Sequence, residues 1–314
     1  MSLAFLFPGQ GSQHVGMGKD FYRRYEAIFS DLFNEANEVL GFDLQKMCFQ
    51  GPAEYLTATE VAQPAILTAS VGVYRLLEQE GITPSAMAGH SVGQFSALVA
   101  SSSLTFADAL QIVRKRGKCM ASVKQPGSMV AIVTSKHELM AEALTWIEEQ
   151  GIDIAAYNAP NQIVLSGAVK QMNEAYKVLD EVEGIKAKKL SVSQAFHSRL
   201  MEEMEAEFME FLMRFSFQPP HVPIVLNSTA VESRDVTLIV EDVRRQCTSP
   251  VRWAQTIKRL AEMEIEQFVE VGSSKTLSGL MRSFAEGYQV HSTESPMALA
   301  KAFKRIRLEG VNHV

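Results

Sequence analysis

The order of apolar and amphipathic segments between Gly127 and Val192 constrains the fold of this chain more than any other feature. The segment SMVAIV at 128–133 reads as a strand, and HELMAEALTWIEEQ after it has the spacing of a helix. The next segments read in turn as strand, strand, helix and strand: IDIAAYN, QIVLSG, VKQMNEAYKVLDEV and AKKLSV. Because β-α-β-β-α-β is the order of a ferredoxin-like unit, we expect a small domain of that kind over residues 126–192.

A different pattern flanks this unit. Short apolar runs alternate there with amphipathic stretches, beginning with Leu3–Phe7 and helix-like segments at 21–40 and 66–79. The later strand-like runs are PIVLNS, QFVEVG and YQVHS, between helices that begin near Arg199, Val236, Val251, Lys275 and Met297. Such alternation is typical of an α/β domain with a parallel sheet. We therefore expect residues 1–125 and 193–314 to form one larger domain that carries the smaller one as an insertion.

Composition and charge argue against several classes of function. The net charge of −6 argues against nucleic acid as a partner, because phosphate binding needs a basic surface. The three cysteines, Cys48, Cys119 and Cys247, lie far apart without metal-ligand spacing, so we expect neither a disulfide framework nor a metal site. The apolar run before Pro8 is too short for a signal peptide, and no window reaches transmembrane length. We expect a cytoplasmic protein with no membrane partner.

The stretch AMAGHSVGQFSAL holds a serine, Ser91, between Gly89 and Gly93. A short apolar run precedes it and apolar residues at helical spacing follow, which is the context of a strand-to-helix elbow that exposes a nucleophile. Glycines at these two positions relieve the crowding of such a turn. A Gly-rich turn with an N-capping serine has the same appearance, so the motif alone leaves both interpretations open.

A serine nucleophile needs a base, and histidine is the usual one because its pKa lies near the working pH. His197, in SVSQAFHSRLM, stands at the expected junction of the two domains, where clefts tend to form. His90 adjoins Ser91, but adjacent residues in an elbow point apart, so His90 is expected to line the pocket instead. The alternative for His197 is a satisfied histidine near a helix start.

The segment TFADALQIVRKRGKCM predicts a helix that starts with a capping-box-like pair, Thr105 and Asp108. Its polar stripe consists of Gln111, Arg114, Lys115 and Lys118, and its inward row of Ala109, Val113, Arg116 and Met120. An arginine on an apolar face is expected to have an anionic partner, since an unpaired buried charge is costly. That partner is either a protein carboxylate in a salt bridge or the carboxylate of a substrate.

The loop FPGQGSQ at 7–13 is not a dinucleotide fingerprint, because His14 stands where the third glycine would be. A Gly-rich loop after the first strand can instead donate a backbone N–H to an oxyanion, beside the N–H of Val92.

Taken together, these features resemble the malonyl-CoA:acyl carrier protein transacylases. The matching pieces are FPGQGSQ, AQPAILTAS, GHSVGQ, VRKRGKCM, NAPNQIVLSG, AFHS, SPVRW and VEVGSSKTLSGL, and they span nearly the whole chain. The resemblance implies an α/β-hydrolase-like large domain with a ferredoxin-like insertion. It also implies that Ser91 is acylated, that His197 is the base and that Arg116 binds the malonyl carboxylate.

The resemblance implies further roles for residues around these three. The backbone N–H groups of Gln10 and Val92 form the oxyanion hole, and the backbone carbonyl of Gln246 orients the histidine. The other substrate-binding positions are His90, Gln63, Phe196 and Met120. No cofactor is bound, coenzyme A enters as the thioester substrate, and a monomer is expected.

The sequence departs from the family pattern at two places. Gln94 follows the second glycine of the elbow where family members commonly have Glu, which removes one charge beside the pocket. Ser273 and Ser274 replace the usual proline or glycine of a loop, a change we expect to be tolerated. Phe196 resembles the bulky residue of malonyl-selective acyltransferases, where a smaller side chain would leave space for an α-methyl group.

The function implied is a ping-pong transfer of malonyl from malonyl-CoA to the phosphopantetheine thiol of an acyl carrier protein in fatty acid biosynthesis. Carrier proteins are generally acidic, so docking is expected on basic residues near the cleft, or these residues are simply solvated. The candidates are Lys186, Lys188, Lys189, Lys115 and Lys118.

Three rival functions remain at this stage. An acyltransferase that serves a polyketide synthase or another specialised carrier keeps the same fold, and Gln94 favours it. A thioesterase would use the same elbow, but Arg116 and the absence of a downstream Asp/His pair in hydrolase order argue against it. A carrier-binding scaffold without activity would not need Ser91, His197 and Arg116 together.

Overall fold

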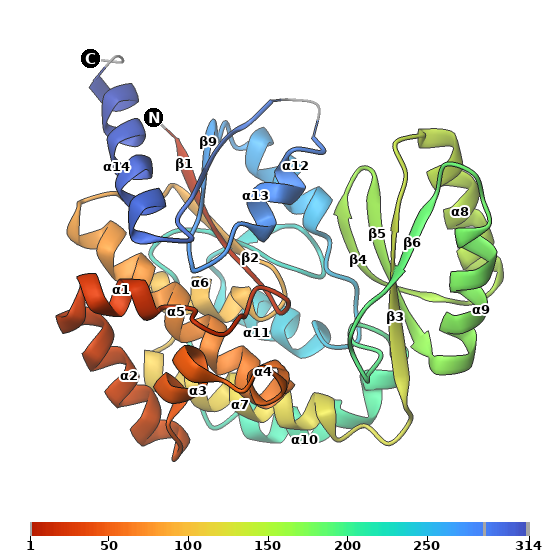
Figure 1. Ribbon diagram of the computed structural model, residues 1–314, viewed down its shortest axis with the longest axis horizontal. Coiled ribbons are helices and arrows are strands. Elements are labelled where there is room, and N and C mark those ends of the chain that lie inside the picture. The colour runs from red at the N-terminus through yellow and green to blue at the C-terminus, as the bar shows by residue number, and fades with distance from the viewer. Residues whose placement is uncertain (1, 285–286, 312–314) are drawn as a thin grey trace.

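A computed structural model describes residues 2–284 and 287–311 (Figure 1). Its larger sheet has the strand order β10-β9-β1-β2-β7-β8, in which β8 alone runs antiparallel to its neighbour. The strands are β1 (Leu3–Phe7), β2 (Ala86–Gly89), β7 (Ile224–Val225), β8 (Glu232–Ser233), β9 (Gln267–Glu270) and β10 (Gln289–Ser292). Every residue of β1 is buried, as expected for a central strand of a parallel sheet covered on both faces.

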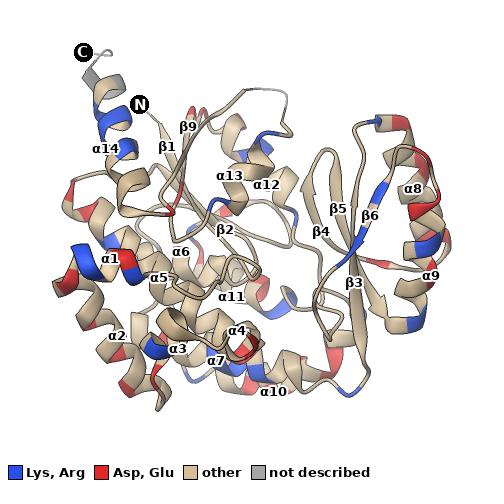
Figure 2. Ribbon diagram, in the orientation of Figure 1, with Lys and Arg blue, Asp and Glu red and all other residues tan. Residues whose placement is uncertain are grey.

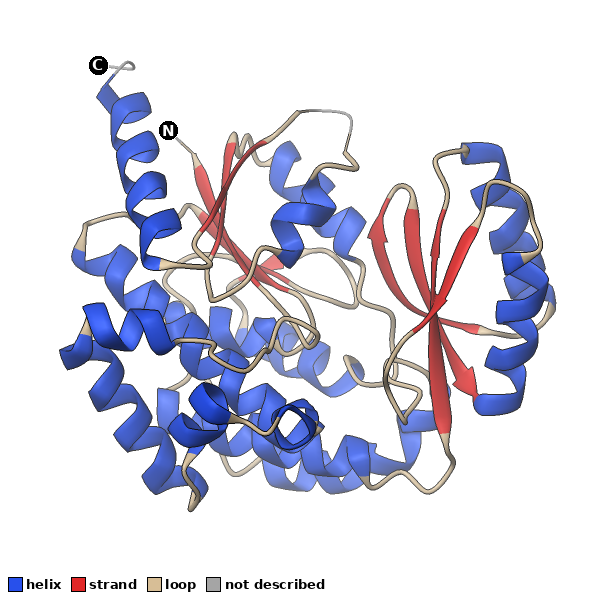
Figure 3. Cartoon of the chain, in the orientation of Figure 1, coloured by secondary structure: helices blue, strands red, loops and turns tan. Residues whose placement is uncertain are grey.

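Helices pack on both sides of this sheet (Figure 3). They are α1 (Lys19–Arg24), α2 (Glu26–Leu40), α3 (Leu44–Gln50), α4 (Ala53–Thr57), α5 (Thr59–Gln79), α6 (Gly93–Ala100), α7 (Phe106–Ala121), α10 (Glu202–Leu212), α11 (Val236–Arg245), α12 (Trp253–Glu262), α13 (Thr276–Met281) and α14 (Pro296–Val311), with a 3₁₀ turn at Arg199–Met201. Among the described residues, none of the helices is both long enough and apolar enough to cross a membrane.

The second sheet lies beside the first and belongs to the insertion (Figure 1). Its elements are β3 (Gly127–Val133), α8 (His137–Glu149), β4 (Asp153–Ala159), β5 (Gln162–Ala168), α9 (Val169–Asp180) and β6 (Lys186–Lys189). The strands pair antiparallel in the order β4-β5-β3-β6, which places the first and third strands of the unit in the middle. The expected α/β class, with a parallel sheet and a ferredoxin-like insertion, is confirmed.

The two faces of the small sheet have different neighbours. Val130 and Ile132 of β3 pack with α8 and α9 in a core of their own. Met129, on the other face, joins the core of the large domain. We propose the domain boundaries near residues 126 and 192, because they fall in the loops that precede β3 and follow β6.

Several element boundaries differ from those expected. The helix expected at 66–79 starts earlier, at Thr59, and runs through Pro64 because the buried contacts of α5 outweigh one lost backbone hydrogen bond. The segment at 21–40 is two helices that meet at Tyr25, whose φ of −130° is not helical. The helix expected near Val251 starts at Trp253, because Val251 is bridged to β4 of the insertion.

Candidate active site

The elbow around Ser91 joins the end of β2 to the start of α6, beside the end of β1. A Cβ on Gly89 would lie 2.0 Å from the backbone carbon of Gly93, and one on Gly93 would lie 2.2 Å from the carbonyl oxygen of Phe7. Both positions therefore require glycine. Ser91 itself has a φ of 52°, in the left-handed region that non-glycine residues rarely adopt. The chain uses this strained turn to present the serine hydroxyl at the carboxyl edge of the sheet.

His197 lies within hydrogen-bond distance of the serine. Its Nε2 is 2.8 Å from Ser91 Oγ, and its Nδ1 is 2.7 Å from the backbone oxygen of Gln246. Since a carbonyl oxygen only accepts, Nδ1 carries the proton and Nε2 is free to accept from the serine hydroxyl. This is the geometry that a base and its nucleophile require.

The imidazole of His197 is held in its neutral form. Burial, with the nearby Arg116 guanidinium acting in the same direction, lowers its pKa from the ordinary value to about 3. At neutral pH the ring can therefore accept a proton.

Arg116 occupies the inward face of α7 with 1% of its surface exposed. Its Nη1 donates to Gln63 Oε1 at 3.0 Å, and its Nη2 donates to Gln246 Oε1 at 2.9 Å and to Ser91 Oγ at 3.1 Å. Its Nε has no hydrogen-bond partner among the residues that the structure describes. No carboxylate among the described residues lies within salt-bridge distance of it, so the interpretation as a structural salt bridge is wrong. A buried cation with only neutral acceptors and a spare donor is suited to receive an anion.

A cavity of about 410 Å³ opens over Ser91 between the two domains. Six of the predicted site residues line it: Gln10, His90, Ser91, Met120, Phe196 and His197. The other four lie buried behind its wall: Gln63, Val92, Arg116 and Gln246. The structure therefore brings all ten into one region.

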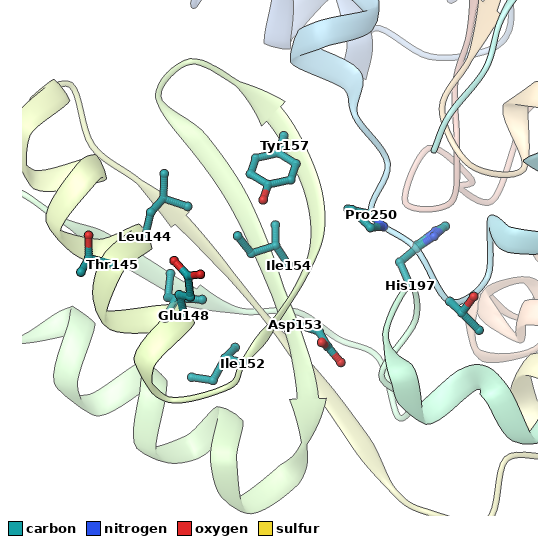
Figure 4. Close-up of a pocket in the computed structure, with 11 residues that line it drawn as sticks. Leu144, Thr145, Glu148, Ile152, Asp153, Ile154, Tyr157, His197 and Pro250 are labelled. Carbon is teal, nitrogen blue, oxygen red and sulfur yellow. The ribbon is translucent and has the colours of Figure 1, made fainter. Parts of the chain in front are cut away.

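A second groove, of about 500 Å³, lies on the other side of His197 (Figure 4). Leu144, Thr145 and Glu148 of α8 form one wall, and Ile154 and Tyr157 of β4 lie beside them. His197 is the sole predicted site residue that lines it, so the reacting atoms are assigned to the smaller cavity.

The loop after β1 is pressed against the elbow. A Cβ on Gly9 would lie 2.5 Å from the carbonyl oxygen of His90, so the loop can approach this closely only with glycine there. This contact brings the backbone of Gln10 to the edge of the cavity. The backbone N–H groups of Gln10 and Val92 have no backbone acceptor among the described turns and loops.

His90 connects the elbow to the insertion. Its Nε2 donates to Asn158 Oδ1 of β4 at 2.8 Å, and burial lowers the pKa of the ring. A neutral His90 that is fixed by Asn158 contributes to the cavity wall rather than to proton transfer.

Asn227 is a site residue that the sequence analysis missed. Its Oδ1 accepts from the backbone N–H of Ser91 at 2.7 Å, and its Nδ2 donates to the carbonyl of Gly89 at 2.7 Å. It clamps the elbow on both sides of the strained serine. A signal was present, because Asn227 directly follows the apolar part of the run PIVLNS and polar groups at the carboxyl ends of parallel strands gather at one edge.

Comparison with known proteins finds a matching family and similar chains. The family model described as acyl transferase domain matches residues 4–305. The malonyl CoA-acyl carrier protein transacylase of Bacillus subtilis (strain 168) is 37% identical over 314 residues, 99% of each chain. The polyketide biosynthesis malonyl CoA-acyl carrier protein transacylase PksC of the same strain is 34% identical, over 89% of this chain and 96% of that protein. The crystal structure of FabD from Acinetobacter baumannii superposes with a TM-score of 0.91 at 31% identity, over 98% of this chain and 99% of that one.

Proposed function

The chain belongs to the acyl transferase domain family, and on that basis we propose that it is a malonyl-CoA:acyl carrier protein transacylase of fatty acid biosynthesis. The observation that carries this proposal is the placement of one hydroxyl, Ser91 Oγ, 2.8 Å from a neutral histidine and 3.1 Å from a buried arginine. A nucleophile, a base and a carboxylate-binding cation are what malonyl transfer requires.

The reaction proceeds in two steps that use the same groups. His197 takes the proton of Ser91 Oγ while this oxygen attacks the thioester carbonyl, and the protonated imidazole then gives the proton to the departing coenzyme A thiolate. The N–H groups of Gln10 and Val92 stabilise the oxyanion of the intermediate. In the second step the carrier's phosphopantetheine thiol attacks the ester and Ser91 recovers its proton. The step sequence uses no cofactor.

Arg116 discriminates between acyl groups. The carboxylate of a malonyl ester lies three bonds from the serine oxygen, close enough to replace Ser91 Oγ as the acceptor of Nη2 and to engage the unpaired Nε. An acetyl group leaves this buried cation without an anion. Phe196 and Met120 line the same cavity and shield the ester from water.

The decisive experiment measures the intact-protein mass after brief exposure to malonyl-CoA or acetyl-CoA, for the parent and for Arg116→Ala. The parent is expected to gain one malonyl group and little acetyl. Arg116→Ala is expected to lose malonyl acylation by about 10²- to 10³-fold, with acetyl acylation changed much less.

The control for this prediction is Arg114→Ala, on the polar stripe of the same helix, which should retain the parent's preference. Rapid release of malonate without an adduct would point to a thioesterase. No reaction with either thioester would indicate a carrier-binding scaffold without activity.

Carrier docking is best supported at two of the five candidate lysines. In the small sheet Lys188 is paired with Ala131, and Ala131 lines the cavity. Paired residues of neighbouring strands point to the same face, so the side chain of Lys188 lies on the cavity face of the sheet. Lys186 lies on the same face because it is two residues away along the strand. Lys189 is on the opposite face, where its Nζ donates to Asn173 Oδ1 at 2.6 Å. Lys115 is paired with Glu207, which leaves less of its charge for a partner. Figure 2 shows the basic residues along β6.

We expect Lys186→Glu with Lys188→Glu to lower kcat/KM for carrier transfer about 10-fold and to weaken its salt dependence. Acylation by malonyl-CoA, measured separately, should be unchanged. The matched control reverses Lys170 and Lys177, which are exposed on α9 at the far side of the small sheet. Equal loss in both half-reactions would contradict carrier docking and indicate that these lysines bind coenzyme A.

A polyketide carrier is a second candidate acceptor. The similarity to PksC, at 34% identity, favours it. Comparing kcat/KM for a fatty acid carrier and a polyketide carrier separates the two functions.

A further inference from the structure

A chain of buried hydrogen bonds connects Arg116 to a carboxylate that it does not touch. Arg116 Nη2 donates to Gln246 Oε1 at 2.9 Å, and Gln246 Nε2 donates to Gln94 Oε1 at 3.1 Å. Gln94 Nε2 then donates to Asp242 Oδ2 at 2.8 Å. All four side chains are at least 97% buried, so none of these groups can exchange its partner for bulk water.

Arg116 and Asp242 stand at the two ends of this series of hydrogen bonds, and they dictate the orientation of the two amides between them. Arginine has only donors, and the two carboxyl oxygens of Asp242 already accept from the backbone N–H groups of Asn227 and Ser228. Gln94 must therefore turn its NH₂ toward Asp242, which leaves its oxygen for Gln246. Gln246 in turn presents its oxygen to Arg116. Reversing either amide would face two donors or two acceptors at about 3 Å, so only one arrangement satisfies every group.

Asp242 is itself fixed from the other side. Its carboxylate accepts from the backbone N–H of Asn227 at 3.1 Å and from that of Ser228 at 2.8 Å. Asn227 is the residue that clamps the elbow at Ser91. The same carboxylate thus anchors the clamp of the nucleophile and the amides that lead to the arginine.

Gln246 is the junction between the two catalytic partners. Its side-chain oxygen accepts from Arg116, while its backbone oxygen is 2.7 Å from His197 Nδ1. Its Nε2 also donates to the carbonyl of Ser91 at 3.2 Å. The amide of Gln94 determines which end of this side chain faces the guanidinium.

We propose that Gln94 is a positioning residue for substrate specificity. Asp242 fixes the amide of Gln94, and Gln94 in turn orients Gln246 so that the neutral side-chain oxygen of Gln246 accepts from Arg116. The guanidinium is thereby fixed in direction without a protein carboxylate that would neutralise it, and its charge remains for the substrate. This inference rests on the proposed function, because it assigns Arg116 to the malonyl carboxylate. It also gives a physical role to the neutral Gln94, which stands where members of the family commonly have Glu.

A double-mutant cycle tests the proposal with Gln94→Met, Gln246→Met and the two combined. Methionine has nearly the length of glutamine but neither donates nor accepts as an amide does, and Gln246→Met retains the backbone oxygen that holds His197. Each single variant is expected to raise KM for malonyl-CoA about 5- to 10-fold with kcat within about 3-fold, because the arginine binds ground state and transition state alike. Acetyl acylation is expected to change less than malonyl acylation, so the malonyl-to-acetyl preference falls in each variant.

The cycle should also show that Gln94 acts through Gln246. The combined variant is expected to resemble Gln246→Met alone, so that Gln94→Met has no further effect in that background. The matched control is Gln194→Met, since Gln194 is a buried glutamine whose NH₂ donates to the carbonyls of Ala121 and Val123. It should lower thermal stability without altering the malonyl-to-acetyl preference.

Three outcomes would overturn the proposal. The first is that folded Gln94→Met keeps the parent's KM for malonyl-CoA and the parent's preference for malonyl over acetyl. The second is that the effects of Gln94→Met and Gln246→Met on KM are additive. The third is that Gln194→Met changes the preference as much as Gln94→Met does. If Gln94→Met does not fold, Gln246→Met tests the proposal by itself. A parental KM for malonyl-CoA in Gln246→Met would show that the side chain of Gln246 does not position Arg116, and would contradict the proposal. Absence of a malonyl adduct on the parent would instead refute the proposed function, and this is measured first.

Discussion

Ser91→Ala is expected to form no malonyl adduct and to lose transfer to the carrier by about 10⁴-fold or more. The structure offers one hydroxyl that contacts both His197 and Arg116, and the substitution removes it. Its backbone contacts through Asn227 should remain, so the elbow is expected to keep its shape. Intact-protein mass after exposure to malonyl-CoA, followed by peptide mapping, measures the effect directly.

The control for this substitution is Ser96→Ala. Ser96 is a buried serine of the adjacent helix α6, and within the described part of the chain its hydroxyl has no hydrogen-bond partner. Its loss should leave both the adduct and the turnover near the parent's values. A malonyl group found on Ser91→Ala would assign the nucleophile elsewhere.

His197→Ala is expected to lower kcat by about 10⁴-fold while the protein still binds malonyl-CoA. The ring is the base within 2.8 Å of Ser91 Oγ, and the same ring returns the proton to the leaving thiolate. Single-turnover acylation measured by rapid quench separates this loss from binding. His221→Ala, at an exposed histidine, is the control.

The pH dependence of acylation also tests the role of His197 as the base. Burial and Arg116 lower the pKa of His197 to about 3, and the neutral ring is the active form. Activity is lost only where the ring becomes protonated, so a lowered pKa moves that loss to lower pH. We expect kcat/KM for malonyl-CoA to stay level between about pH 8 and pH 5. An acid limb centred near the ordinary value of 6.5 would show that the imidazole is not shielded as the structure indicates.

The family and the fold class were predictable from the sequence because both depend on local signals. The spacing Gly89, Ser91, Gly93 requires only neighbouring residues to define an elbow. The β-α-β-β-α-β order requires only the period of apolar residues along 127–192. The burial of Arg116 followed from its place on an apolar helix row, which is also a local property.

The partners of these residues were not predictable in this way. Asn227 reaches Ser91 because β7 lies beside β2 in the sheet, and no period in the sequence encodes that neighbour. Gln94 of α6 and Asp242 of α11 likewise meet across a large separation in the sequence. The strand order and the packing of helices bring together positions more than a hundred residues apart.

The sequence by itself therefore determined the elements, the insertion and the residue types that malonyl transfer requires. Only the tertiary structure decided which groups face one another. In place of a protein carboxylate, it put the neutral oxygens of Gln63, Gln246 and Ser91 beside Arg116. The physical reason is that periodicity and motif spacing act over a few residues along the chain, whereas a hydrogen bond is set by distances in space that only the packed sheet and helices define.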